Sequence, residues 1–172
     1  MRYATMNRAI RLPFVFWVVL LAMIFTAKFA LAEPYKADPG PHAVDTFLLD
    51  LQDDARDRTV PIKVYLPKAV DTPRPIILVS HGLRGTRQGL SYLGNHWASH
   101  GYICIHLQHH GSDDTVWRDV PARDRLKAMR KAAMTPQAAI DRANDVPFVL
   151  DQLILLNKDS NSQLYNQLDL GS

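Results

Sequence analysis

The chain has 172 residues, with 20 Lys and Arg against 17 Asp and Glu and a formal net charge of +3. Four of the basic residues and none of the acidic ones lie in the first 32 residues, so the rest holds 16 basic and 17 acidic residues, a net charge of −1. This balance excludes the basic face that nucleic-acid binding requires. The single cysteine, Cys104, excludes an intrachain disulfide, and its apolar surroundings predict a buried small hydrophobe.

The N-terminus has the three parts of a secretory signal: basic residues, an apolar run at residues 12–27, and the small residues of Ala30-Leu31-Ala32. The alternative is an uncleaved membrane anchor, but a span needs about 20 apolar residues and Lys28 interrupts this run. We therefore expect a signal peptide at residues 1–32, cleavage after Ala32, a periplasmic or secreted protein, and no stable membrane anchor afterwards. Residues 33–172 are enough for one domain or part of one.

The first predicted elements form a hairpin. Residues 44–51 are apolar enough for a strand, and a polar turn follows at residues 53–58. Apolar side chains then alternate with wetter ones over residues 60–66, which is the period of a strand. Pro61 cannot donate to a ladder of hydrogen bonds, so this second strand is predicted to be an outer one.

A strand–helix–strand unit comes next. Residues 75–80 and 102–107 are continuously apolar, as parallel strands covered on both faces tend to be. The segment between them has apolar side chains at helical spacing and ends at Gly101. Such a unit places its two strands parallel, with a right-handed crossover.

Two helices are predicted after the second of these strands. A short helix is expected around residues 123–133, in a charged region. Thr135-Pro136 is a favourable start for a longer helix that reaches Asn157 and is bent by Pro147. One apolar face is predicted along it, at Ile140, Ala143, Val146, Val149, Leu150, Leu153 and Leu156.

Polar residues follow both parallel strands where they end, in "SHGL" (residues 80–83) and "HLQHHGSD" (residues 106–113). Ligands of open parallel sheets bind outside the carboxyl ends of the strands. A His-Gly turn there can direct backbone N–H groups at an oxygen that gains negative charge, an oxyanion hole worth about 3 to 4 kcal/mol per donor. The alternative is that Gly82 and Gly85 only let the chain turn into a helix.

Four segments in a fixed order carry a resemblance: "RTVPIKVYLP", "PIILVSHGLRGTRQGLSYLGNHWASHGYICI", "QHHGSD" and "DVPFVLDQL". They resemble the alpha/beta-hydrolase superfamily, and within it the platelet-activating-factor acetylhydrolase and dienelactone-hydrolase-like group of secreted esterases, from Asp57 to about Leu156. In that family the residue after His-Gly supplies an oxyanion-hole N–H, which maps onto Leu83, and Gly82 allows the close approach. Arg84 stands where the family often has Gly, which affects the loop shape more than a backbone donor.

The resemblance implies a mostly parallel α/β sheet with an N-terminal antiparallel hairpin, a small-molecule ester substrate and no cofactor. Its chemistry is acyl transfer by a serine in G-x-S-x-G, followed along the chain by an acid and a histidine. The chain has no G-x-S-x-G. Ser91 comes nearest but lies in a predicted helix, and Ser80 matches a structural serine of the family.

In family order, "QLDLGS" at residues 167–172 is where the strand before the nucleophile begins. The sequence is therefore interpreted as an N-terminal fragment truncated before that strand, with all three triad residues downstream. We expect such a fragment to have no esterase activity, and to be poorly soluble because a strand edge is left unpaired.

The polar residues after the second parallel strand have an alternative interpretation, a metal site. His106, His109, His110 and Asp113 could form a metal site, but neighbouring histidines do not readily converge in tetrahedral geometry, and we predict no metal. His109 and Asp113 are instead predicted to lie on the rim of the substrate pocket.

Arg142 and Asp145 occur on the helix where the family also has an Arg and an Asp, and packing with salt bridges is their expected role. For the chain as a whole, the alternatives to a hydrolase fragment are a non-catalytic remnant or binding module, and a periplasmic metal binder.

Overall fold

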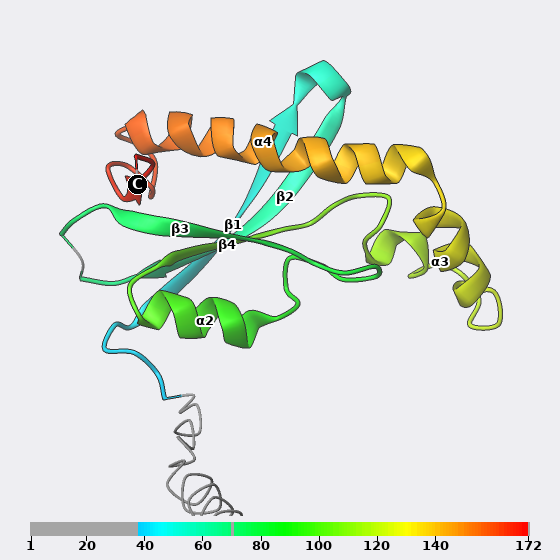
Figure 1. Ribbon diagram of the computed structural model, residues 1–172, viewed down its shortest axis with the longest axis horizontal. Coiled ribbons are helices and arrows are strands. Elements are labelled where there is room, and N and C mark those ends of the chain that lie inside the picture. Colours follow the sequence, from blue (N-terminus) through cyan, green and yellow to red (C-terminus); the bar gives the residue numbers. More distant parts are fainter. Residues whose placement is uncertain (1–37, 70, 172) are drawn as a thin grey trace, which may run out of the picture. The chain divides into compact units, whose positions relative to one another are not determined.

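The computed structural model describes residues 38–69 and 71–171, and the predicted signal peptide lies outside these residues. One mixed five-stranded sheet has the order β1-β2-β4-β3-β5. Figure 1 shows β1 to β4 of this sheet. Its strands are β1 (Val44–Asp53), β2 (Arg58–Pro67), β3 (Arg74–Ser80), β4 (Ile103–Leu107) and β5 (Leu168–Asp169). The α-helices described are α2 (Ser91–Ser99), α3 (Arg125–Ala133) and α4 (Pro136–Lys158), with short 3-10 helices at Asp54–Arg56 (η1) and Asp114–Val116 (η2). None of these helices is long and apolar enough to cross a bilayer.

The predicted hairpin is confirmed. β1 and β2 pair antiparallel from Val44 opposite Pro67 to Asp53 opposite Arg58. The Asp53 carboxylate caps the intervening η1 by accepting the Arg56 N–H at 3.3 Å. The prediction that β2 is an outer strand is wrong, because β2 lies between β1 and β4. Pro61 is tolerated because the β2–β4 pairing extends only to Ile62, and its carbonyl oxygen accepts the Gln108 N–H at 2.8 Å.

The strand–helix–strand unit is also confirmed. β3 and β4 pair parallel, from Ile76 opposite Ile103 to Ser80 opposite Leu107. Between them α2 ends before Gly101, whose φ of 96° lies in the left-handed region that favours glycine. The register brings the ends of β3 and β4 to the same level at one edge of the sheet.

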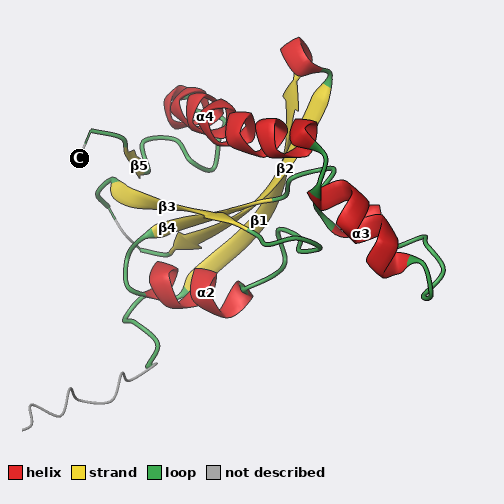
Figure 2. Cartoon of the chain, turned by 45° about the vertical axis from the view of Figure 1, so that its right-hand side comes forward, coloured by secondary structure: helices red, strands yellow, loops and turns green. Residues whose placement is uncertain are grey.

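Helices cover both faces of the sheet, with α4 on one side and α2 on the other (Figure 2). On the α4 side, alternate β4 residues pack with Val149 and Leu153 in the main core. On the α2 side, Cys104 packs with Tyr65 and Ala98. Burial raises the pKa of the Cys104 thiol to about 12, so its predicted role as a buried hydrophobe is confirmed.

The start of α4 at Thr135-Pro136 is confirmed, but its apolar face was predicted only in part. Val149 and Leu153 are fully buried, whereas Ile140 is 51% exposed. In the first turns a charged residue, Asp145, is buried instead. The helix therefore presents apolar residues to the core in its second half and polar residues to the ends of the strands in its first half.

β5 begins where the family order predicted the next strand. Leu168 and Asp169 pair parallel with Arg74 and Pro75 of β3. The Asn157 side chain fixes this strand by bonding both the N–H and the carbonyl oxygen of Leu168, at 3.0 and 3.2 Å. Beyond Pro75, this edge of β3 has no neighbouring strand among the described residues.

Candidate active site

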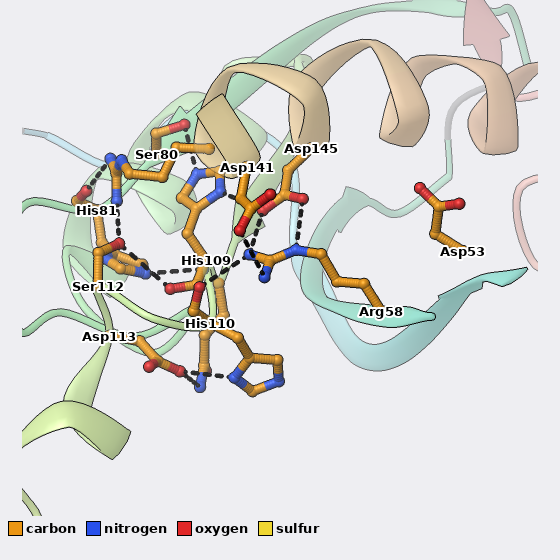
Figure 3. Close-up of polar contacts among 12 residues, drawn as sticks. Asp53, Arg58, Ser80, His81, His109, His110, Ser112, Asp113, Asp141 and Asp145 are labelled. Atoms are coloured by element: carbon orange, nitrogen blue, oxygen red, sulfur yellow. Dashed lines mark hydrogen bonds and ion pairs between the residues drawn. The ribbon is translucent and has the colours of Figure 1, made fainter. Parts of the chain in front are cut away.

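The two polar segments predicted to lie together do meet. Ser80 and Leu107 are opposite each other where β3 and β4 end, so the loops that follow them start side by side. Helix α4 reaches the same place with Arg142 and Asp145, and η1 and β2 contribute Arg56 and Arg58. Figure 3 shows Arg58 and Asp145 facing each other beside His109.

His81 is the first residue of the turn, and its ring is built into the protein with 5% exposure. Its Nε2 accepts the backbone N–H of His109 at 3.0 Å, so Nε2 carries no proton. The proton is on Nδ1, which donates to the Gly82 carbonyl oxygen at 2.6 Å. Burial lowers the pKa of His81 below its ordinary value of 6.5, so the ring is neutral at pH 7.

Arg142 and Ser112 hold the rest of the turn. The Arg142 guanidinium donates to the His81 carbonyl oxygen at 2.7 Å and to the Ser112 hydroxyl at 2.8 Å. The Ser112 carbonyl oxygen accepts the Arg84 N–H at 2.9 Å. The N–H groups of Gly82 and Leu83 have no acceptor among the described residues, so the fixed turn contains two free backbone donors.

His109 links the turn to α4. Its Nδ1 donates to the Asp145 carboxylate at 2.9 Å, and its Nε2 lies 3.0 Å from the Ser80 hydroxyl (Figure 3). The order Ser–His–Asp has the connectivity of a hydrolase triad. Sequence analysis did not predict that these three residues meet, because Ser80 and Asp145 are far apart along the chain.

Two arginines also bind the carboxylate of this Ser–His–Asp arrangement. Arg58 binds Asp145 with two bonds of 2.9 Å, and Arg56 adds a third of 2.9 Å. The buried Asp145 carboxylate therefore joins His109 on the loop after β4 to Arg56 and Arg58 on the hairpin. The arrangement fixes the His109 ring and the Ser80 hydroxyl beside the turn.

Both buried carboxylates of the site are ionised. Burial alone would raise the pKa of Asp145, but hydrogen bonds from His109 and Arg58 and the charge of Arg58 outweigh it and hold the pKa far below 3.8. Burial would likewise raise the pKa of Asp113, and bonds from Thr115, Gln108 and His110 lower it instead.

The structure corrects the predicted pocket rim. His109 and Asp113 are 1% and 0% exposed, and their polar atoms are bonded inside the protein, so neither lines a pocket. The neighbouring His110 and Gly111 instead line a groove of about 510 Å³ beside α3 and α4.

Gly82 and Leu83 lie in the turn as predicted, and their part in an oxyanion hole stays a prediction. A Cβ atom at Gly82 would meet no heavy atom within 4 Å, so space for a ligand is open there. Arg84 takes the left-handed conformation, with a φ of 76°, so the chain keeps a glycine-like loop shape with an arginine.

The histidines considered as metal ligands have separate partners. The His106 ring packs on Tyr65, with ring centroids 4.8 Å apart, and its Nδ1 bonds the Gly89 carbonyl oxygen. His109 bonds Asp145, and His110 bonds Asp113 at 3.0 Å. In the part of the chain that the structure describes, no three potential ligands are grouped for a metal ion.

Sequence analysis did not predict which residues hold the turn in place. Arg142 and Asp145 were expected to be explained by packing and salt bridges. Asp145 does form salt bridges, but with Arg56 and Arg58, and Arg142 bonds the turn itself. A signal was present in the sequence, since a charged residue interrupts the apolar face of α4 at Asp145.

Gly85 gives a first prediction about the turn. A Cβ atom at Gly85 would lie 2.6 Å from Cβ and 2.9 Å from Cγ of His81, which the surrounding bonds hold in place. We expect Gly85→Ala to lower the free energy of unfolding by about 1 to 3 kcal/mol, as overpacking does. Gly82→Ala is the matched control and should stay within about 1 kcal/mol of the parent protein. Equal losses in both variants, measured by urea denaturation, would show that the His81 ring does not set the space in this turn.

Part of the chain resembles a known protein family. Residues 50–133 match the family model described as platelet-activating factor acetylhydrolase, isoform II. The match covers β2, β3, β4 and both loops of the site, and it stops before α4. A search of curated proteins found no match. Through residues 50–133, the chain is similar to the platelet-activating factor acetylhydrolase isoform II family, an alpha/beta-hydrolase family of enzymes that cleave ester bonds.

Proposed function

We propose that this chain supplies the oxyanion-hole part of a serine-type carboxylic-ester hydrolase. The observation that carries the proposal is the Leu83 N–H, which has no acceptor among the described residues in a turn held by Arg142, Ser112 and His109. A donor fixed before the reaction stabilises an alkoxide without the cost of reorganisation. The similarity to a family of ester hydrolases indicates that the reacting group is an ester.

We propose that the nucleophile comes from polypeptide that continues β5. Support comes from the parallel register of β5 beside β3 and from the open edge of Ile76–Ser80 next to it. No serine of the described residues stands in G-x-S-x-G, and the Ser80 hydroxyl is bonded to the buried His109 ring. In the proposed reaction a serine oxygen attacks the ester carbonyl carbon, and a histidine takes the proton and passes it to the leaving alcohol. Water then cleaves the acyl-enzyme.

We further propose that the enzyme acts in the periplasm or outside the cell on a small-molecule ester. The basic, apolar and small-residue pattern of residues 1–32 supports export, and the near-neutral charge of residues 33–172 suits a small-molecule substrate better than a nucleic acid.

The purified 172-residue chain is expected not to hydrolyse p-nitrophenyl acetate above the rate of a sample unfolded in urea and then diluted. The physical reason is that an oxyanion donor without an activated hydroxyl has no alkoxide to stabilise. Turnover that a serine-directed phosphonate abolishes would contradict the proposed source of the nucleophile.

The gene sequence provides an independent test. The proposal predicts a reading frame beyond the codon for Ser172 that encodes G-x-S-x-G and then an acid and a histidine. A stop codon with no such sequence in any frame beyond it would overturn the hydrolase in favour of a non-catalytic remnant or binding module.

A further inference from the structure

Two histidines lie one turn apart at the end of α2. The His100 N–H donates to the His96 carbonyl oxygen at 3.2 Å, so the helical turn between the two residues is complete. Residues at this spacing are neighbours on one side of a helix. The ring centroids lie 4.6 Å apart, with an interplanar angle of 60°. His100 is exposed and His96 is half-buried, so solvent reaches the pair.

The separation of the two rings suits imidazoles that bind one metal ion. With a metal–nitrogen bond of about 2 Å, two rings bound at a right angle have centroids about 4.5 Å apart. The wider tetrahedral angle that Zn²⁺ prefers needs a separation of about 5 Å. Imidazole suits copper, nickel and zinc, and right angles between ligands are typical of Cu²⁺ and Ni²⁺. The pair therefore has the spacing of a two-histidine chelate for an ion of the second kind.

A backbone carbonyl group determines which nitrogen of His100 is available to an ion. His100 Nε2 lies 3.3 Å from the Asp38 carbonyl oxygen. Because a carbonyl oxygen only accepts, Nε2 carries a proton, and the lone pair of the neutral ring is on Nδ1. Histidines that bind metal ions almost always donate their other ring N–H to a carbonyl, a carboxylate or water. His100 therefore already has the outer hydrogen bond of a metal ligand.

The surroundings of the pair favour a cation. The last carbonyl groups of a helix carry partial negative charge, and the pair lies at this end of α2. A pocket of about 390 Å³ lies beside His96, with Asn95 and Ser99 among its walls. This pocket provides space for the water molecules that complete the coordination of an ion.

His42 lines the same pocket but is not assigned as a ligand. Its ring and the Arg74 guanidinium both lie 3.8 Å from the position that a Cβ atom at Gly101 would take. A guanidinium group this close disfavours a metal ion bound to His42. No three potential ligands are grouped within residues 38–69 and 71–171, so a site at the pair has two protein ligands and water.

We propose that His96 and His100 form a binding site for a divalent transition-metal ion, with Cu²⁺ bound most tightly. Cu²⁺ stands above Ni²⁺ and Zn²⁺ in the usual order of affinities for nitrogen ligands. The site precedes the first residue of β4, whereas the candidate active site follows its last residue, so the ion takes no part in the proposed ester cleavage.

An ion at the pair also strengthens the attachment of the segment before β1 to α2. The Gly40 N–H donates to the Ser99 hydroxyl at 2.8 Å, and the His42 N–H donates to the Ser99 carbonyl oxygen at 3.1 Å. A metal ion on Nδ1 of His100 holds that ring in place, and with it the bond from Nε2 to Asp38.

The test is calorimetric titration of the chain, made without an affinity tag, with CuCl₂, ZnCl₂ and MgCl₂. We expect Cu²⁺ to bind at least about tenfold more tightly than Zn²⁺, and Mg²⁺, which prefers oxygen ligands, not to bind at the pair. His96→Gln and His100→Gln should each weaken Cu²⁺ binding by at least about tenfold, because a single imidazole remains. Electron paramagnetic resonance of the bound Cu²⁺ should show two nitrogen ligands in the parent chain.

The double variant Asn95→His/His96→Asn is the matched control for spacing. It keeps the number of histidines but places the two rings on different sides of the helix, so it should bind Cu²⁺ as weakly as His96→Gln. His42→Gln should keep the affinity of the parent chain within about twofold. Thermal unfolding without metal checks that each variant folds, and added Cu²⁺ should raise the midpoint for the parent chain and for His42→Gln only.

Four results would overturn the site: Cu²⁺ binding that survives both single substitutions, equal affinity in the spacing variant and the parent chain, a loss in His42→Gln as large as in His96→Gln, or bound Cu²⁺ without nitrogen ligands. Zn²⁺ binding as tightly as Cu²⁺ would contradict the right-angle geometry. Since the readouts are binding and spectroscopy, these results are independent of whether any ester is hydrolysed.

Discussion

Asp145→Asn is expected to lower the free energy of unfolding by about 3 to 5 kcal/mol, the range seen when one partner of a buried ion pair is removed. The Asp145 carboxylate is fully buried and accepts bonds from Arg58, Arg56 and His109. An asparagine keeps the shape but leaves the charge of Arg58, whose side chain is only 13% exposed, without its main counter-charge.

Asp141→Asn is the matched control for this prediction. Asp141 lies on the same helix, 3.8 Å from Arg58, with its side chain 24% exposed. Its loss should cost less than about 1 kcal/mol, as for partly exposed ion pairs. Guanidinium chloride denaturation of the two variants measures the difference, and equal losses would show that the buried network is not the source of stability.

The pH dependence of stability follows from the same carboxylate. The pKa of Asp145 is lowered in the folded state, so its contribution is complete above the unfolded value near 3.8 and is lost as the pH falls below it. The lowered pKa of His81 acts in the same direction, because below about pH 6.5 the unfolded chain takes up a proton that the folded ring resists. The parent protein should therefore lose stability in acid more steeply than Asp145→Asn.

Removing the Leu83 N–H is expected to have the largest effect on catalysis. In the proposed hydrolase with its nucleophile beyond β5, replacing the Leu83 peptide amide with an ester linkage should lower kcat by about 10²- to 10³-fold, the usual cost of one oxyanion donor. KM should change little, because the donor acts on charge that develops in the transition state. Leu83→Ala keeps the N–H and should lose less than about tenfold. A larger loss from the side-chain change than from the ester would contradict the assignment.

The regular elements could be predicted because their signals are local. The alternation at residues 60–66 predicts the second strand of the hairpin, and the continuous apolar runs of β3 and β4 predict the parallel pair. The structure confirms both. The position of β2 within the sheet could not be predicted from the local sequence, because its second neighbour, β4, comes much later in the chain. Pro61 therefore predicts an outer strand from the sequence alone, but in the structure it lies next to the end of the β2–β4 pairing.

The position of the site in the fold could be predicted, but the hydrogen bonds that form it could not. Parallel strands bring their ends together, so the two polar segments could be placed at one edge. Their bonds could not be foreseen, because they join residues as distant as Arg58 and Asp145, 87 positions apart. His109 and Asp113 belong to a polar segment, which predicts exposure at the surface. They are buried in the structure because their side chains bond Asp145 and Gln108 inside the protein.

The Leu83 amide itself provides the most direct test of the account. The ¹⁵N-labelled parent chain is titrated with methylphosphonate, a tetrahedral anion that imitates the oxyanion. The account predicts that the Leu83 amide proton moves downfield and saturates, with a shift larger than that of Arg84, whose N–H is already bonded to Ser112. A Leu83 amide that does not move while methylphosphonate binds elsewhere, or that is already protected from solvent exchange by an internal bond, would contradict it.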